Sequence, residues 1–473
     1  MKLNRLFTTL LLCGAAVGAS AQTIGQQELS QLKNSFIKDA QTIATQNILL
    51  GDANIKGKTK DLSKVNEVDH FFKYRADVKG ITDQQGSGRC WMFTSMNALR
   101  PTAQKKYDYS KFDFSHNYNY FWDMLEKSNL YLENIIRTAG KEITDQEVVW
   151  YLQSPVGDGG VWNLFYNLGE KYGVVPKEVM PETVHSNNTG QMTGVINRRL
   201  KKAGWDIRQV YEQKTANMKK NNKKAQEELA AALKAAKMEA LEDVYRILAL
   251  CLGEPPTEFT WKYKNDKGEV VTVKTTPQEF YKGLIPDNYN TQTYIMIMND
   301  PTREYYKVYD IANYRNTIEG VNWVYLNLPN EEIKEAALKS IKANEPLYAS
   351  CDVGKESDTK AGVCNPGMYD YESLLGIDLS MDKKARILTR YSGSSHAMLL
   401  MACDTDENDK PVKWQFENSW GAGSGHNGYL TFTDKWFDEF MFRIVINKKY
   451  LSEKAVEAAQ QTPVTLPAWD YMW

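Results

Sequence analysis

The sequence predicts an α+β fold, with a helical first half and an antiparallel β-sheet in the last third. The stretch 225–252 repeats apolar residues every three or four positions, the period of a helix with one buried face. From about residue 320 the pattern changes to short apolar or alternating runs, such as His396–Ala402 and Tyr429–Phe432, which are typical of strands. A chain of 473 residues, 42% of them apolar, is long enough to bury a large core around both parts.

The charge balance indicates that function depends on a local site. Lys and Arg number 58 against 59 Asp and Glu, so the chain has no overall basic field for nucleic acid. The segment Lys214–Lys224 carries five lysines. Nucleic-acid binding through this segment is one interpretation, but a solvated helical face or a linker fits better, and we expect no nucleic-acid partner.

The first residues are typical of a secretory signal. Lys2 and Arg5 precede the uncharged run Leu6–Ala21, which ends in the small residues Ala19-Ser20-Ala21. This run is too short to span a bilayer stably. A lipid anchor on Cys13 is the alternative, but the bulky Leu12 before it argues against that processing. We therefore expect cleavage after Ala21 and a soluble protein that is periplasmic or secreted.

The cysteines point to one reactive thiol. Removal of the signal leaves five cysteines, an odd number, so at least one thiol is unpaired. Cys90 follows the turn-rich loop 83–89 and begins a helical pattern that we expect Pro101 to end. A helix N-terminus stabilises a thiolate, the nucleophilic form of cysteine. For Cys351 and Cys364, a disulfide and two reduced thiols both remain open.

A thiol nucleophile needs a base, and His396 is the best candidate. It opens an apolar strand directly after the loop Ser392–Ser395. Asn418 follows about twenty residues later, and its amide can orient the imidazole without adding a negative charge. The rival base, His426, lies in a glycine-rich loop that is poorly suited to fixing a ring. The sequence thus predicts Cys90, His396 and Asn418 as the catalytic residues.

Two further residues complete the predicted site. The side-chain amide of Gln84 and the backbone N–H of Cys90 are placed to hold a developing oxyanion. Trp420 is placed to cover the hydrogen bond between Asn418 and His396. Each residue alone has an ordinary reading as a core or turn residue, and only their order along one chain is specific. This chemistry requires no metal and no organic cofactor.

These motifs resemble the papain superfamily of cysteine peptidases, and within it the bleomycin hydrolase and aminopeptidase C family. The resemblance rests on segments that run from about residue 60 to the end of the chain. They are Gln84–Trp91 (with Ser87 in place of the papain-like cysteine, so that disulfide is absent), Asp158–Trp162, Glu170–Pro176, His396-Ala397, Asn418–Gly421 and Leu466–Asp470.

The resemblance implies a papain-like two-lobed fold with a large helical insertion. It also implies hexameric barrels and a C-terminal arm that lies in the active-site cleft, where its carboxylate meets the free amine of a peptide. Gly159 and Gly160 would present backbone to the substrate, and Trp473 would end the arm. The expected divisions are a signal peptide (1–21), the arm and catalytic-helix part (22–115), a helical lobe and insertion (116–320), a sheet lobe (321–458) and the C-terminal arm (459–473).

The predicted function is therefore an exported cysteine aminopeptidase. Two features depart from the family pattern. The signal peptide is one, since the better-known relatives are cytosolic. The other is the arm, in which Tyr471 stands where the family usually has proline and which stops early at the bulky Trp473. The departure in the arm leaves dipeptidyl or endopeptidase action as alternatives. A non-catalytic peptide-binding homologue is a further alternative, which the intact set of Gln84, Cys90, His396 and Asn418 argues against.

Overall fold

The computed structural model describes residues 23–219, 222–285 and 289–471, and the chain divides into two compact units, 1–59 and 60–473. The predicted signal peptide lies outside the described residues. The described residues of the first unit form three short helices, α1 (Gln26–Ser35), α2 (Ala40–Gly51) and α3 (Ile55–Thr59). Asp39 caps α2, because its carboxylate accepts a hydrogen bond from Thr42 N at 2.7 Å.

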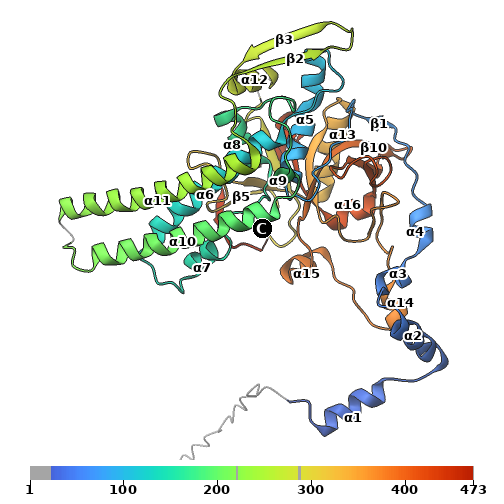
Figure 1. Cartoon of the computed structure of the whole chain (residues 1–473). Helices are drawn as coiled ribbons and strands as arrows, with labels where there is room; N and C mark the ends of the chain where they lie inside the picture. Colours follow the sequence, from blue (N-terminus) through green and yellow to red (C-terminus); the bar gives the residue numbers. More distant parts are fainter. Residues whose placement is uncertain (1–22, 220–221, 286–288, 472–473) are drawn as a thin grey trace, which may run out of the picture. The chain divides into compact units, whose positions relative to one another are not determined.

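The second unit is an α+β domain, as the sequence predicts (Figure 1). Its helices lie mainly in the first half of the chain, and its larger sheet is built mainly from the second half. The helices are α4 (Leu62–Asn66), α5 (Cys90–Tyr107), α6 (His116–Thr138), α7 (Gln146–Gln153), α8 (Trp162–Tyr172), α9 (Val184–Asn187), α10 (Gly190–Thr215), α11 (Lys223–Leu252), α12 (Pro277–Leu284), α13 (Asn330–Lys342), α14 (Tyr371–Leu375), α15 (Lys383–Leu388), α16 (Asp434–Phe440), the 3-10 helix η1 (Lys448–Tyr450) and α17 (Glu453–Ala458).

The larger sheet holds twelve strands. Its main path runs in the order β14 (Val464–Leu466), β5 (Lys307–Ile311), β6 (Val324–Asn327), β4 (Tyr294–Met298), β13 (Met441–Asn447), β7 (Leu347–Cys351), β10 (His396–Thr405), β11 (Pro411–Glu417), β12 (Tyr429–Thr433), β9 (Val363–Cys364) and β8 (Ser357–Asp358), and β1 (Tyr74–Arg75) pairs with β10. A separate hairpin is formed by β2 (Phe259–Lys264) and β3 (Val270–Thr275).

The sheet differs from the predicted one in two respects. It is mainly antiparallel, but the pairs β4–β6, β5–β14 and β9–β12 are parallel. In addition, β2 to β5 lie within 116–320, which we expected to be helical. In β2, Phe259, Trp261 and Tyr263 are buried and the residues between them are exposed. This alternation is typical of a strand, but it falls in the segment 116–320, which we expected to be helical.

Helix α5 is longer than the sequence suggested. We expected Pro101 to end it, but the helix continues to Tyr107 with Pro101 inside. Proline removes one backbone hydrogen bond from a helix interior. Here the loss is offset by tertiary packing, because Ala103 in the following turn is fully buried. Helix α5 packs on β10 and β7, and this contact brings the start of the helix to the sheet.

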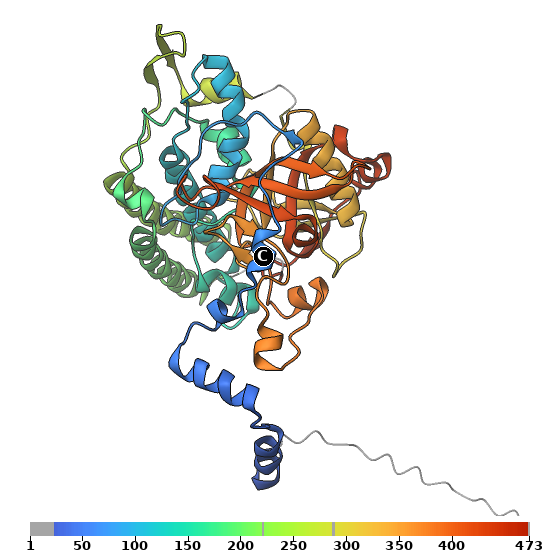
Figure 2. The same ribbon diagram turned by 90° about the vertical axis from the view of Figure 1, so that its right-hand side faces the viewer.

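Two large apolar clusters lie one on each face of the sheet, and a third, smaller one comprises Ala76, Val78, Leu399 and Met401. The first joins the helical half to the sheet, and the second packs α13, α16 and α17 on the opposite face. Figure 2 shows α5 between the strands and the helices α6 to α11. Helices α10 and α11 form a long hairpin. The lysine-rich segment 214–224 runs from the end of α10 to the start of α11, which agrees with its interpretation as a linker. Within the described residues, no helix combines the length and apolar character that crossing a membrane requires.

Candidate active site

Cys90 is the first residue of α5 and follows a tightly held loop. The backbone N–H of Gly88 donates to Asp158 Oδ2 at 2.6 Å, and Trp91 Nε1 donates to Asp158 O at 2.8 Å. The buried Arg89 donates to Ser87 Oγ at 3.0 Å and forms an ion pair with Glu182 at 2.9 Å. These contacts fix the helix N-terminus, so the position of the thiol follows from the rigid elements around it.

His396 begins β10, where it pairs with Cys351 of β7. Its Nε2 lies 2.8 Å from Asn418 Oδ1, and its ring stacks on Trp420 with the ring centroids 4.7 Å apart. The structure therefore brings together the predicted histidine, asparagine and tryptophan. Burial is the largest influence on the pKa of the Cys90 thiol and raises it, while the backbone N–H of the next residue, Ala397, interacts with the sulfur and acts in the opposite direction.

Asn418 is held by the end of β11 and by the loop that follows. Its Oδ1 also accepts a hydrogen bond from Ser419 N at 2.8 Å, and only 1% of the residue is exposed. The preceding Glu417 is buried and bonded to Arg100 of α5 at 2.8 Å through both carboxylate oxygens. This ion pair joins the helix that carries Cys90 to the strand that positions Asn418.

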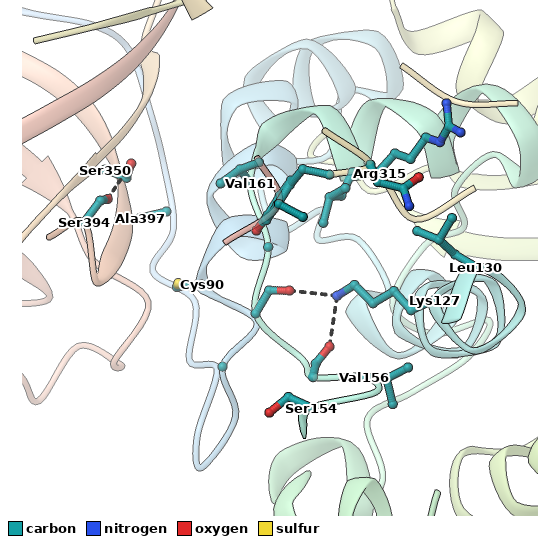
Figure 3. Close-up of a pocket in the computed structure, with 18 of the residues that line it drawn as sticks. Cys90, Lys127, Leu130, Ser154, Val156, Val161, Arg315, Ser350, Ser394 and Ala397 are labelled. Atoms are coloured by element: carbon teal, nitrogen blue, oxygen red, sulfur yellow. Dashed lines mark hydrogen bonds between the residues drawn. The ribbon is translucent and has the colours of Figure 1, made fainter. Parts of the chain in front are cut away.

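A cavity of about 660 Å³ borders Cys90 and His396. Strand residues line one side, and α6, the loop before α8 and the segment 312–315 line the other. Figure 3 shows Ser350, Ser394 and Ala397 on the strand side, Cys90 beside Ala397, and Lys127 and Arg315 across the cavity. A cavity of this size accommodates several residues of an extended peptide.

Burial opposes a charge on either member of the Cys90–His396 pair. It raises the pKa of the Cys90 thiol to about 11 and lowers the pKa of His396 to about 4. The hydrogen bond between His396 and Asn418 acts in the opposite direction on the pKa of His396 but is the smaller effect. A thiolate at this position therefore needs an opposite charge nearby to be stable.

Gln84 borders the same cavity, and its side chain is fixed at both ends. Its Nε2 donates to Ser87 O, and its Oε1 accepts from Ser419 Oγ at 2.6 Å. An amide nitrogen has two hydrogens, so the bond to Ser87 leaves one for a further acceptor. Ser419 thus connects Gln84 to the asparagine that orients His396.

Gly159 and Gly160 both line the cavity, but for different reasons. A Cβ on Gly160 would lie 2.7 Å from the ring of Trp91 and 2.8 Å from Leu164, so this glycine is required by packing beside the nucleophile. A Cβ on Gly159 meets no atom within 4 Å. Of the two, only Gly159 fits the expectation that glycine keeps space open for substrate.

The described part of the C-terminal arm contacts the cavity at Ala468. Strand β14 pairs with β5, and beyond it Asp470 forms an ion pair with Arg303 at 2.5 Å, with the ring of Tyr471 over the same guanidinium. Trp473, the predicted end of the arm, lies outside the described residues.

The structure also places the alternative base, His426, and the two cysteines that could have formed a disulfide. His426 stacks on His70 with the ring centroids 3.9 Å apart, and neither ring borders the cavity of Cys90. Cys351 and Cys364 are both buried and unbridged. Within the described ranges, no three His, Cys, Asp or Glu groups gather as metal ligands.

Several positioning residues escaped sequence reasoning. Asp158 holds the nucleophile loop, Ser419 bridges two site residues, and Arg100 with Glu417 joins their elements. Asp158 and Ser419 lie in the motif segments Asp158–Trp162 and Asn418–Gly421, and this was the only sign in the sequence that they belong to the site. Arg100 and Glu417 lie 317 positions apart in the chain, and no local pattern connects them.

Comparison with known proteins agrees with this geometry. The model of the Peptidase C1-like family matches residues 23–473. The chain belongs to this family. The match includes 23–59, which the motif resemblance had left out. The enzyme is a papain-like cysteine peptidase that resembles aminopeptidase C and bleomycin hydrolase.

Individual relatives cover nearly the whole chain. Aminopeptidase C of Lactobacillus delbrueckii subsp. lactis is 36% identical and covers 88% of this chain and 90% of the relative. Bleomycin hydrolase of Homo sapiens is 32% identical, with 96% and 99% covered. The crystal structure of PepW from Lactobacillus rhamnosis superposes with a TM-score of 0.87 at 33% identity and covers 95% of this chain and 98% of that one. This similarity confirms the predicted papain-like fold.

Proposed function

We propose that the protein is an exported aminopeptidase, which hydrolyses peptides from a free N-terminus through Cys90, His396 and Asn418. The observation that carries the proposal is the His396–Asn418 hydrogen bond of 2.8 Å at the edge of the cavity that Cys90 borders. Relatives named aminopeptidase C and bleomycin hydrolase, which cover most of the chain, support the same activity.

In the proposed mechanism, His396 removes the proton from Cys90 as the sulfur attacks the scissile carbonyl. Asn418 holds the imidazole in one orientation and stabilises the imidazolium that forms. The backbone N–H of Cys90 and the remaining N–H of Gln84 donate to the oxyanion, and loss of one such donor typically costs about 2.7–4 kcal/mol in the transition state. His396 then protonates the leaving amine, and water releases the acyl group from Cys90.

Export and assembly are part of the proposal. The sequence Leu6–Ala21 supports export with cleavage after Ala21, to the periplasm or the medium. N-terminal sequencing of the exported protein should begin at Gln22. Family resemblance supports a homohexamer, which mass measurement of the purified protein in solution tests.

The C-terminal arm favours a second candidate, dipeptidyl or endopeptidase action. Asp470 is anchored by its ion pair with Arg303. No described residue from Trp469 to Tyr471 lines the cavity of Cys90. Where the arm stays outside the cavity, additional substrate residues have room.

One experiment separates these activities. The mature enzyme is incubated with peptides of one sequence whose N-terminus is either free or acetylated. Cleavage of only the free peptide, one residue at a time, supports aminopeptidase action, and cleavage of both supports an endopeptidase. Cys90→Ala should abolish all hydrolysis and labelling by a thiol-reactive epoxide while leaving the fold intact. Wild-type turnover in that variant would contradict the assigned nucleophile.

A further inference from the structure

The oxyanion donor of the proposed mechanism, Gln84, is held by Ser87 at two points. Its side-chain Nε2 donates to Ser87 O, and the Ser87 hydroxyl donates back to Gln84 O at 2.6 Å. The residues between them, Gln85 and Gly86, are exposed, so little packing fixes this part of the loop. The direction of the remaining Nε2 hydrogen of Gln84 therefore depends on where Ser87 lies.

Ser87 is fixed in turn by Arg89, whose Nε donates to Ser87 Oγ at 3.0 Å. Arg89 is completely buried, and its guanidinium lies over the rings of Phe93 and Tyr120, 5.2 and 5.3 Å from their centroids. A guanidinium is planar and its donors point in fixed directions. Because the two rings set the position of the guanidinium, they also set the direction of its bond to the Ser87 hydroxyl.

Glu182 supplies the charge that balances the buried Arg89. Arg89 Nη2 donates to Glu182 Oε2 at 2.9 Å. His116 lies near the same carboxylate, with its Nδ1 3.9 Å from Glu182 Oε1. Burial lowers the pKa of His116 well below its ordinary value, and the charge of Arg89 acts in the same direction. His116 is therefore neutral near pH 7 and does not compete with Arg89 for the ion pair.

The segment that carries Glu182 is anchored in the helical half of the domain. Asn117 of α6 donates through Nδ2 to Pro181 O at 2.9 Å. On the other side of Glu182, Thr183 Oγ1 donates to Cys251 O of α11 at 2.9 Å. A continuous series of hydrogen bonds thus runs from two helices through Glu182 to the loop that ends at the nucleophile.

We propose that Glu182 and Arg89 are positioning residues for the oxyanion donor Gln84, on which they act through the Ser87 hydroxyl. Neither residue lines the cavity of Cys90, so neither acts on a bound peptide directly. The proposal rests on the proposed peptidase function, in which Gln84 donates to the oxyanion. The competing interpretation is that the ion pair only stabilises the fold or only holds Cys90.

Two reactions of Cys90 separate these roles. Both the formation and the hydrolysis of the acyl-enzyme pass through an oxyanion, whereas alkylation of the thiol by iodoacetamide displaces iodide and forms none. Both reactions are measured for Ser87→Ala and Glu182→Gln, each alone and combined with Gln84→Ala. Glu178→Gln makes the same chemical change at an exposed position of the segment before α9 and is the matched control. Thermal unfolding shows which variants fold.

We expect kcat for peptide hydrolysis to fall about tenfold or more in Ser87→Ala and in Glu182→Gln, because a small displacement of a catalytic group is costly. KM should change little, since the oxyanion exists only after attack. Alkylation of Cys90 should keep the wild-type rate. In the Gln84→Ala background, the same substitutions should change kcat by less than about twofold, because the donor that they position is gone. Glu178→Gln should match the wild type throughout.

Losses of kcat that add to that of Gln84→Ala would overturn the proposal, and so would slower alkylation of Cys90, since both results mean that the contacts hold the fold or the nucleophile. A wild-type kcat in folded Ser87→Ala would also overturn it, even if Glu182→Gln failed to fold. Failure of the proposed function has a different signature. The wild type would then cleave no peptide, or Gln84→Ala would keep full activity and leave no oxyanion donor to position.

Discussion

Arg100 donates through Nη2 to both carboxylate oxygens of Glu417, each at 2.8 Å, and both side chains are almost completely buried. Arg100 lies ten residues after the nucleophile on α5, and Glu417 directly precedes Asn418. Asn97, also on α5, donates to the same carboxylate at 3.0 Å. The helix that carries Cys90 and the strand that precedes Asn418 are therefore joined by a buried polar contact.

Breaking this ion pair should damage both stability and activity. Arg100→Leu or Glu417→Leu alone leaves a buried charge without its partner, which typically costs about 3–5 kcal/mol of unfolding free energy. The double variant should recover much of that loss. Urea unfolding checks the energies, and kcat shows whether the position of Asn418 depends on the pair. Additive losses in the double variant would show that the two groups act independently.

Removal of the imidazole should make the thiol unreactive near neutral pH. In His396→Leu, Cys90 has no partner to take its proton, and burial holds its pKa at about 11, above the ordinary value of about 8.5. A raised thiol pKa keeps the thiol protonated to higher pH, so alkylation of Cys90 by iodoacetamide should rise only in alkaline solution. In the wild type, it should already proceed at pH 7.

Mass spectrometry of the Cys90 peptide measures that alkylation separately from the other cysteines. If the alkylation of Cys90 in His396→Leu reached half of its maximal rate at or below pH 8.5, the helix N-terminus would stabilise the thiolate without the imidazole.

The two cavity glycines offer a matched pair of substitutions. Gly160→Ala places a methyl group 2.7 Å from Trp91, and such overpacking typically costs about 1–3 kcal/mol. Gly159→Ala meets no atom within 4 Å and should leave stability unchanged while raising KM for peptides. Thermal unfolding and steady-state kinetics test both. Equal unfolding temperatures for the two variants would contradict the packing role of Gly160.

Loosening the arm should broaden the substrate range. Arg303→Ala removes the ion pair to Asp470 and the contact with Tyr471. A loss of about 1.4 kcal/mol of anchoring changes the occupancy of the arm roughly tenfold. We therefore expect cleavage of N-acetylated peptides to increase relative to free peptides, as in a variant that lacks residues 470–473.

The control for this change is Lys384→Ala, which removes an exposed cation from the same surface hollow as Arg303. This variant should keep the wild-type ratio of free to acetylated substrate. An unchanged ratio in Arg303→Ala would mean that the anchored arm does not govern access to the cleft.

The sequence pointed to residues that the structure places around one cavity, because these residues sit in distinctive local contexts. A cysteine after a glycine-rich loop and before a helical pattern identified Cys90, and a histidine that opens an apolar strand identified His396. The strands β10 and β12 were predicted near their observed positions because their apolar runs are short and bounded by turn residues. These signals depend on neighbours within a few positions.

The errors arose where distant contacts override local preference. Pro101 lies inside α5 because the next turn is buried in the core, and β14 pairs in parallel with β5 across more than 150 residues of chain.

The amino-acid order by itself singled out Cys90, His396 and Asn418 as candidates, since a nucleophile, a base and an orienting amide are recognisable by type and local setting. Only the folded chain decided what surrounds them: the buried pair of Arg100 and Glu417, the different roles of Gly159 and Gly160, and Arg443 in the wall of the cavity. Burial and charge pairing depend on distances through space between residues hundreds of positions apart, and no short-range pattern encodes those distances.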